Sequence, residues 1–168
     1  MLTDLSADPD VIRYIGNGQL WTPQRAAEVA DAALAHWERH GFGWRVAVIR
    51  ETGEKVGFMA LNFAGEGTPG VARDEYEIGW WLAPSAWRRG LASEGARSLR
   101  DEAFRRLAAP SVIAQIQPAN AASRAVAERL GMAIDFETVG GTGEPVLVFR
   151  LTRPRAAHAD GRIDTRDG

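Results

Sequence analysis

Apolar residues recur at the three- and four-residue spacing of an amphipathic helix in two long parts of the chain. The first part lies between Thr22 and Gly41. Thr22 provides an N-cap hydroxyl, Pro23 follows at the first helical position, and glycine ends the run. The second part extends from Ser93 to Leu107. We predict one helix in each part, and the apolar stripe of the first comprises Ala26, Val29, Ala30, Ala33, Leu34 and Trp37.

Two shorter helices are predicted from their capping residues. One begins at Asp8-Pro9 and ends at Gly16, and the other extends from Asn120 to Leu130, where Gly131 closes it. Elsewhere the apolar residues form short runs or alternate with polar ones, as is typical of strands. The predicted strands are Trp44 to Arg50, Lys55 to Phe63, Glu75 to Leu82, Ser111 to Ile116, Ala133 to Val139, and Val146 to Thr152.

The order of these elements predicts a mixed α/β fold. A mostly antiparallel sheet of about six strands would be flanked by helices. A doubly wound sheet is excluded, because hairpins join the strands at each end of the chain. We expect one domain over residues 1–153, followed by a polar tail without periodicity over 154–168.

Composition narrows the possible functions. The 168 residues carry 20 basic and 22 acidic side chains, and this balance is unlike that of a general nucleic-acid binder. Cysteine is absent, which excludes disulfides and thiol nucleophiles, and three histidines argue against a metal site. No apolar run reaches the length of about 20 residues that crosses a bilayer. We therefore expect a cytoplasmic protein that binds no metal, nucleic acid or membrane.

The segment between the third predicted strand and the next helix has the chemistry of an anion site. Arg88 and Arg89 are followed by Gly90, and small residues open the helix. A helix N-terminus presents free N–H groups and the positive end of the helix dipole, and glycine lets successive amides converge on one phosphate. The alternative is a solvated turn with a capping residue. The segment matches neither the Walker nor the Rossmann pattern.

Two segments, WLAPSAWRRGLASEGARSL and IQPANAASRAVAERLGM, resemble motifs of the GNAT superfamily of acetyl-CoA-dependent N-acetyltransferases. The resemblance covers about residues 8–153 and is strongest to the ribosomal-protein N-acetyltransferase-like branch. In the first motif Trp87, Gly90 and Ala92 take the positions of Gln/Arg, Gly and Gly/Ala. Trp87 departs from the general pattern but is familiar in this branch.

The resemblance implies acetyl-CoA as co-substrate and a primary amine, either a protein N-terminus or a small molecule, as acceptor. The acetyl group would move by direct attack through a tetrahedral intermediate. Trp21 and the loop before it would shape the acceptor site. The main chain of Trp81 and Leu82 would pair with the pantetheine arm, and Asn120 would contact that arm from the other side. The backbone amides that would hold the pyrophosphate belong to Arg88, Arg89, Gly90, Leu91, Ala92 and Ser93.

Two side chains are candidates for catalysis. Glu77 resembles the superfamily's strand glutamate and would act as the base, and Gly79 on the same face would leave room for a substrate. Many members use a helix tyrosine as the acid, but this chain has Ala127 there, and Ser123 matches a serine given that role in the branch. The alternatives are a surface glutamate, a helix-face serine and a water molecule that carries the proton.

Compared with the family pattern, which opens with a strand and part of a helix, we expect this chain to lack the first strand of the fold. The sheet would then expose an edge beside the strand from Trp44 to Arg50. We expect a second subunit or the C-terminal tail to cover this edge, or the native start to lie upstream. The lost tyrosine and the short N-terminus support an alternative function as a non-catalytic acyl-CoA-binding sensor. A third alternative is a structural domain with a fortuitous basic loop. His36 and His40 are expected to be ordinary surface residues.

Overall fold

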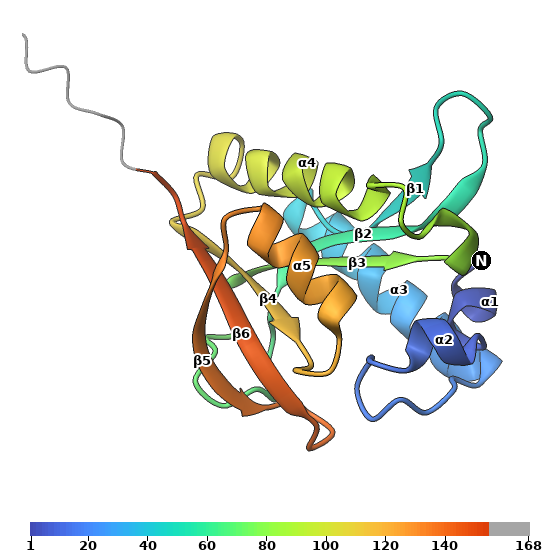
Figure 1. The fold of residues 1–168 in the computed structure, drawn as a ribbon, viewed down its shortest axis with the longest axis horizontal. Helices are drawn as coiled ribbons and strands as arrows, with labels where there is room; N and C mark the ends of the chain where they lie inside the picture. Colours follow the sequence, from blue (N-terminus) through green and yellow to red (C-terminus); the bar gives the residue numbers. More distant parts are fainter. Residues whose placement is uncertain (155–168) are drawn as a thin grey trace, which may run out of the picture.

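Six strands form one sheet with the order β1-β2-β3-β4-β6-β5 (Figure 1). The computed structural model describes residues 1–154, so all but the first residue of the predicted tail lies outside the described residues. Neighbouring strands are antiparallel, except that β3 and β4 are parallel. The strands are β1 Arg45–Val48, β2 Lys55–Phe63, β3 Tyr76–Leu82, β4 Ser111–Ile116, β5 Ala133–Val139 and β6 Pro145–Thr152. The mixed α/β sheet predicted from the sequence is thus confirmed.

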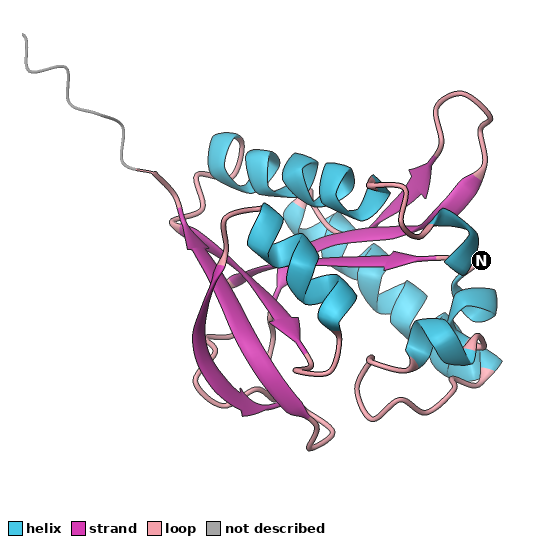
Figure 2. Ribbon diagram, in the orientation of Figure 1, coloured by secondary structure: helices cyan, strands magenta, loops and turns pink. Residues whose placement is uncertain are grey.

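Helices cover both faces of the sheet (Figure 2). α4 and α5 lie on one face, and α3 passes behind the other, with α1 and α2 beside its N-terminal end (Figure 1). A short 3-10 turn, η1, connects β3 to α4. The helical elements are α1 Leu2–Ser6, α2 Pro9–Ile12, α3 Pro23–His40, η1 Pro84–Ala86, α4 Leu91–Arg105 and α5 Ala121–Arg129.

The structure differs from the expectations for the helices at four points. α2 ends at Ile12 rather than at Gly16, with Arg13 as its C-cap. α1 was not predicted, because its five residues show neither a side-chain cap nor a full helical period. α4 begins at Leu91 rather than Ser93, since Gly90 adopts the left-handed conformation and takes the N-cap position. Leu34, placed in the apolar stripe of α3, is 61% exposed, so the buried face of that helix is narrower than the apolar pattern indicates. The caps of α3, Thr22 and Gly41, are where the sequence placed them.

The two faces of β3 have different roles. Ile78 is fully buried in the main core, and Trp80 packs against that core together with Leu99 of α4. On the opposite face Trp81 packs against Trp21 and Trp44, with ring centroids 5.2 and 5.4 Å apart. Alternation along the strand therefore directs Glu77 and Gly79 toward the side of Trp81 and not into the main core.

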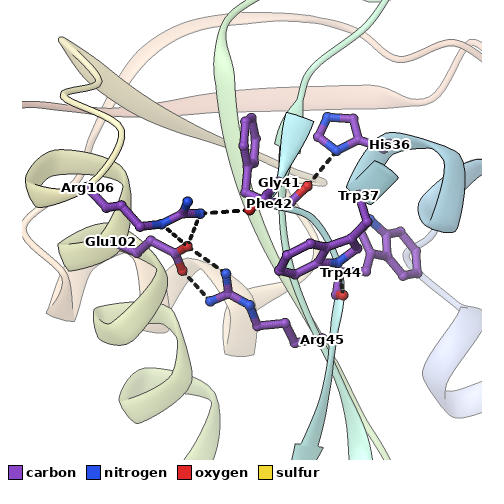
Figure 3. Close-up of polar contacts among 8 residues, drawn as sticks. All are labelled: His36, Trp37, Gly41, Phe42, Trp44, Arg45, Glu102 and Arg106. Carbon is purple, nitrogen blue, oxygen red and sulfur yellow. Dashed lines mark hydrogen bonds and ion pairs between the residues drawn. The ribbon is translucent and has the colours of Figure 1, made fainter. Parts of the chain in front are cut away.

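A polar cluster joins the end of α3, the start of β1 and α4 (Figure 3). Glu102 lies between two guanidinium groups and accepts hydrogen bonds from Arg45 at 2.7 Å and from Arg106 at 2.8 Å. Trp37 donates from its indole to the carbonyl of Trp44 at 2.6 Å. These contacts fix the α3–β1 connection, which brings the ring of Trp44 to the face of the sheet that carries Trp81.

The two histidines of α3 differ in their surroundings. His40 is exposed, as expected, but His36 is half-buried. The Nδ1 atom of His36 lies 2.8 Å from the carbonyl oxygen of Phe42, and its Nε2 atom accepts from the amide of Phe63 at 3.4 Å. The prediction of a surface residue is therefore wrong for His36, which connects α3 to the sheet.

Candidate active site

β3 and β4 separate along their length, and a cavity opens at the separation. Within the described residues, Glu77 and Ile113 are the one register pair between these parallel strands. The cavity has a volume of about 340 Å³. Glu77, Gly79 and Trp81 line it from β3, and Asn120 and Ser123 line it from the start of α5. The structure therefore brings both predicted catalytic residues and two of the predicted pantetheine contacts to one space.

Glu77 occupies an unusual electrostatic position for a carboxylate. Burial raises its pKa from 4.5 to about 7, because the charged form loses solvation in the cavity wall. Gln115 donates to Oε1 of Glu77 at 3.2 Å, and this hydrogen bond and the Asn62 side chain lower the pKa without cancelling the effect of burial. A carboxylate that titrates near neutrality is suited to accept a proton at physiological pH.

Ser123 is held by two hydrogen bonds. Its amide donates to the Oδ1 atom of Asn120 at 3.1 Å, which is the N-cap interaction of α5. Its hydroxyl oxygen accepts from the indole nitrogen of Trp80 at 3.2 Å. The indole occupies one lone pair of the oxygen, so the hydroxyl hydrogen can point to an acceptor in the cavity.

Ala127, one turn further along α5, is completely buried. It has no polar side chain that could replace the family's helix tyrosine as the acid.

The backbone between η1 and α4 forms a turn with left-handed residues. Arg88 and Gly90 both have positive φ, of 58° and 79°, with Arg89 between them. The first helical hydrogen bond runs from the amide of Glu94 to the carbonyl of Gly90 at 3.0 Å.

Within residues 1–154 the amides of Arg88 through Ser93 donate to no hydrogen-bond acceptor, and no atom would lie within 4 Å of a Cβ at Gly90. Free amides in an alternating turn at a helix start form a good site for a phosphate. The residues present therefore fit a diphosphate.

Leu82, whose main chain is expected to pair with the pantetheine arm, already has a hydrogen-bond partner. Its carbonyl oxygen accepts a hydrogen bond from the indole of Trp87 at 2.7 Å. The side chain of Trp87 is 43% exposed, so this bond closes over the end of β3 at the surface. Leu82 and the segment from Arg88 to Ser93 do not line the cavity but follow it along the chain.

Several cavity residues have no signal in the sequence that predicts their place. Tyr14 comes from the segment after α2, Thr68 from the β2–β3 loop, Gln115 from β4 and Glu144 from the β5–β6 turn. They are far apart in sequence and meet only through the fold.

Across the described residues, no group of three or more His, Cys, Asp or Glu side chains could hold a metal ion. The described helices include none that is long and apolar enough to span a membrane.

Comparisons with known proteins agree with this geometry. The sequence profile of the acetyltransferase (GNAT) domain family matches residues 1–133. FsC-acetyl coenzyme A-N(2)-transacetylase of Aspergillus fumigatus is 31% identical over 131 residues, which are 76% of this chain and 55% of that protein. The chain thus spans little more than half the length of this relative.

Solved structures show the same fold. An acetyltransferase of Agrobacterium tumefaciens superimposes with a TM-score of 0.75 and 33% identity, over 90% of this chain and 83% of that chain. The ribosomal L7/L12 alpha-N-protein acetyltransferase RimL, in complex with coenzyme A, has a TM-score of 0.70 at 18% identity, over 90% and 86% of the two chains, which shows the fold alone. The resemblance to the superfamily is confirmed, whereas the ribosomal-protein branch is one of several kinds of relative.

Proposed function

The chain belongs to the acetyltransferase (GNAT) domain family, and on that premise we propose that it transfers the acetyl group of acetyl-CoA to the nitrogen of a primary amine by direct attack. The observation that carries this proposal is the cavity between β3 and β4. A carboxylate with a pKa of about 7 and a serine hydroxyl line the same space. The segment with free amides, from Arg88 to Ser93, follows at the end of β3.

Acetyl-CoA would be bound by main-chain groups. The amides of Arg88 through Ser93 would hold the pyrophosphate, because they donate to no acceptor within residues 1–154. Trp81 and Leu82 at the end of β3 would pair with the pantetheine arm, with Asn120 on the other side. The indole of Trp87 would have to release the Leu82 carbonyl if that oxygen is one of the pairing groups.

Glu77 is proposed as the base. An amine reaches the enzyme as an ammonium ion, and its nitrogen can attack the thioester carbonyl only after it loses a proton. The Glu77 carboxylate would accept that proton directly or through a water molecule. Its raised pKa makes it a stronger base than an ordinary glutamate and leaves it partly ionised at neutral pH.

Ser123 is proposed as the acid. When the C–N bond has formed and the C–S bond breaks, the sulfur leaves as a thiolate and needs a proton. The hydroxyl of Ser123 would supply it, with Trp80 holding the oxygen in place. The nitrogen loses two protons in all: the first goes to Glu77 and from there to solvent, and the second leaves the nitrogen of the tetrahedral intermediate and replaces the proton that Ser123 gives to the sulfur. The acetyl group moves from sulfur to nitrogen.

The acceptor is proposed to bind at the aromatic face of β3. Trp44 and Trp81 line the cavity together with Tyr14, and the carboxylates of Glu77 and Glu144 are the acidic groups there. Lys, Arg and His are absent from the described lining. An ammonium group is favoured by both aromatic faces and carboxylates.

Release of thiol from acetyl-CoA with a panel of amines tests the proposal. The panel should include N-terminal peptides, polyamines, aminoglycosides and amino acids. We expect turnover with at least one amine, with kcat/KM rising through an apparent pKa of about 7. Glu77→Gln should lose this rise and about 10²- to 10⁴-fold in kcat. A Glu77→Gln variant with full kcat at every pH would exclude Glu77 as the base.

Ser123→Ala should lower kcat with little change in the Kd for coenzyme A. Tight binding of acetyl-CoA without turnover of any amine would favour the sensor function. Failure to bind coenzyme A at all would favour a purely structural domain.

A further inference from the structure

A chain of hydrogen bonds leads from a loop to the carboxylate of Glu77. The hydroxyl of Thr68, in the loop between β2 and β3, donates to Oε1 of Gln115 at 2.7 Å. The Nε2 group of Gln115 then donates to Oε1 of Glu77 at 3.2 Å. All three side chains line the cavity and are partly buried.

Glu77 determines which group donates and which accepts in each of these hydrogen bonds. An ionised carboxylate can only accept hydrogen bonds, so Gln115 must present its NH2 group to Glu77 and its oxygen to Thr68. Thr68 must then donate. The arrangement therefore favours the ionised form of Glu77 over the protonated form.

We propose that Thr68 and Gln115 are positioning residues for the base. Thr68 fixes the amide of Gln115, and Gln115 holds Oε1 of Glu77 so that Oε2 faces the acceptor. This inference rests on the proposed role of Glu77 as the base. It adds the two residues that orient the Glu77 carboxylate. Neither residue needs to touch the acceptor.

The register of β3 and β4 explains why Gln115 can reach Glu77. Glu77 pairs with Ile113, and Gln115 lies two residues further along β4, on the same face as Ile113. The loop that carries Thr68 is also held in place by a hydrogen bond from β5. The Thr138 hydroxyl on β5 donates to the carbonyl of Pro69 at 3.0 Å, beside Thr68.

Few other groups in the cavity wall affect the pKa of Glu77. From β2, Asn62 lies opposite Glu77 and lowers its pKa further. Tyr14 and Glu144 are the other titratable groups of the described cavity wall. With no cationic side chain in that wall, hydrogen bonds rather than an ion pair oppose the effect of burial.

Two variants test the proposal by separate readouts. Thr68→Val keeps the shape of the side chain but removes the donor, and Gln115→Leu removes the amide. The first readout is the titration of the Glu77 carboxylate by infrared difference spectroscopy, with Glu77→Gln identifying its band. The second is the pH profile of kcat/KM. Thr152→Val, at the exposed end of β6, is the matched control, and circular dichroism checks that each variant folds.

We expect the pKa of Glu77 to rise by about half a unit in Thr68→Val and by about one unit in Gln115→Leu. The acidic limb of the pH profile should move by the same amounts, with kcat largely recovered at high pH. The control should leave both readouts unchanged.

An unshifted titration of Glu77 in both folded variants would overturn the proposal, because Thr68 and Gln115 would then have no effect on the Glu77 carboxylate. A shifted titration without any change in the pH profile would support the positioning role and show instead that Glu77 is not the base.

Discussion

At the scale of single residues, the pKa of Glu77 results from two opposing effects of its surroundings. Burial and hydrogen bonding act in opposite directions on its pKa, and burial dominates, leaving the pKa at about 7. The ordinary glutamate in the unfolded chain titrates near 4.5. The folded protein therefore binds more protons than the unfolded chain between these two pH values. It follows that the free energy of unfolding decreases as the pH rises through this window.

The variant Glu77→Gln should remove this cost of ionisation. At pH 8 we expect its free energy of unfolding to exceed that of the wild type by about 2 kcal/mol, after allowing for the part of the carboxylate that reaches solvent. At pH 4 the two should be nearly equal, because Glu77 is then protonated in both states. Urea unfolding at the two pH values measures the difference.

Glu54→Gln, on the exposed β1–β2 turn, is the matched control and should show no such dependence on pH. Equal stability of wild type and Glu77→Gln at both pH values would contradict the raised pKa.

At the scale of elements, the start of α4 is the proposed site of the diphosphate of coenzyme A. Gly90 has a φ of 79° and is the N-cap of α4, so its conformation sets the direction of the amides that follow. An L-residue in this region costs roughly 1–2 kcal/mol. Open space around Gly90 means that the penalty comes from the backbone and not from a clash.

Gly90→Ala should therefore weaken the binding of coenzyme A by about tenfold. Gly53→Ala is a matched control, because Gly53 in the β1–β2 turn also has a positive φ, of 71°, and no neighbour within 4 Å of a Cβ. Both variants should lose similar thermal stability without ligand, and only Gly90→Ala should lose affinity by titration calorimetry. Equal affinity in the two variants would mean that the Gly90 segment does not bind the cofactor.

The elements also show where sequence reasoning succeeds. Thr22-Pro23, Gly41 and Asn120 are local signals, because a cap acts on amides a few residues away, and the helices they predict are confirmed. The exposure of Leu34 could not be predicted, because it depends on how α3 sits against the sheet. The charged contacts of Glu102 and the half-burial of His36 also arise from packing between distant segments.

At the scale of the whole molecule, the cavity is a property of the topology. β3 and β4 are adjacent but parallel, and their separation creates the space that Glu77 and Ser123 share. The sequence indicated Ser123 through the second motif and Glu77 through its position on the third predicted strand. It could not indicate Thr68 or Gln115, whose roles depend on a loop and a strand that meet only in the folded chain. The proposed base and acid could thus be named from the sequence, whereas the residues proposed to position the base could not.

The sheet ends at β1, whose outer edge has no strand partner within residues 1–154. Val46 and Val48 on this strand are 44% and 51% exposed. An exposed edge with apolar side chains favours pairing with another strand. We propose that a second copy of the chain provides it, since an antiparallel β1–β1 pair satisfies the same edge of both subunits with two-fold symmetry.

This proposal predicts a dimer in solution that depends on β1. Light scattering after gel filtration should give twice the chain mass of 18.3 kDa for the wild type and a monomer for Val46→Lys, which places a charge at the pairing edge. Leu34→Lys, at an exposed apolar position on α3, is the control and should remain dimeric. A monomeric wild type would contradict pairing between copies. Because Val46 neither lines the cavity nor belongs to the Arg88–Ser93 segment, the monomeric variant should still bind coenzyme A, which separates assembly from cofactor binding.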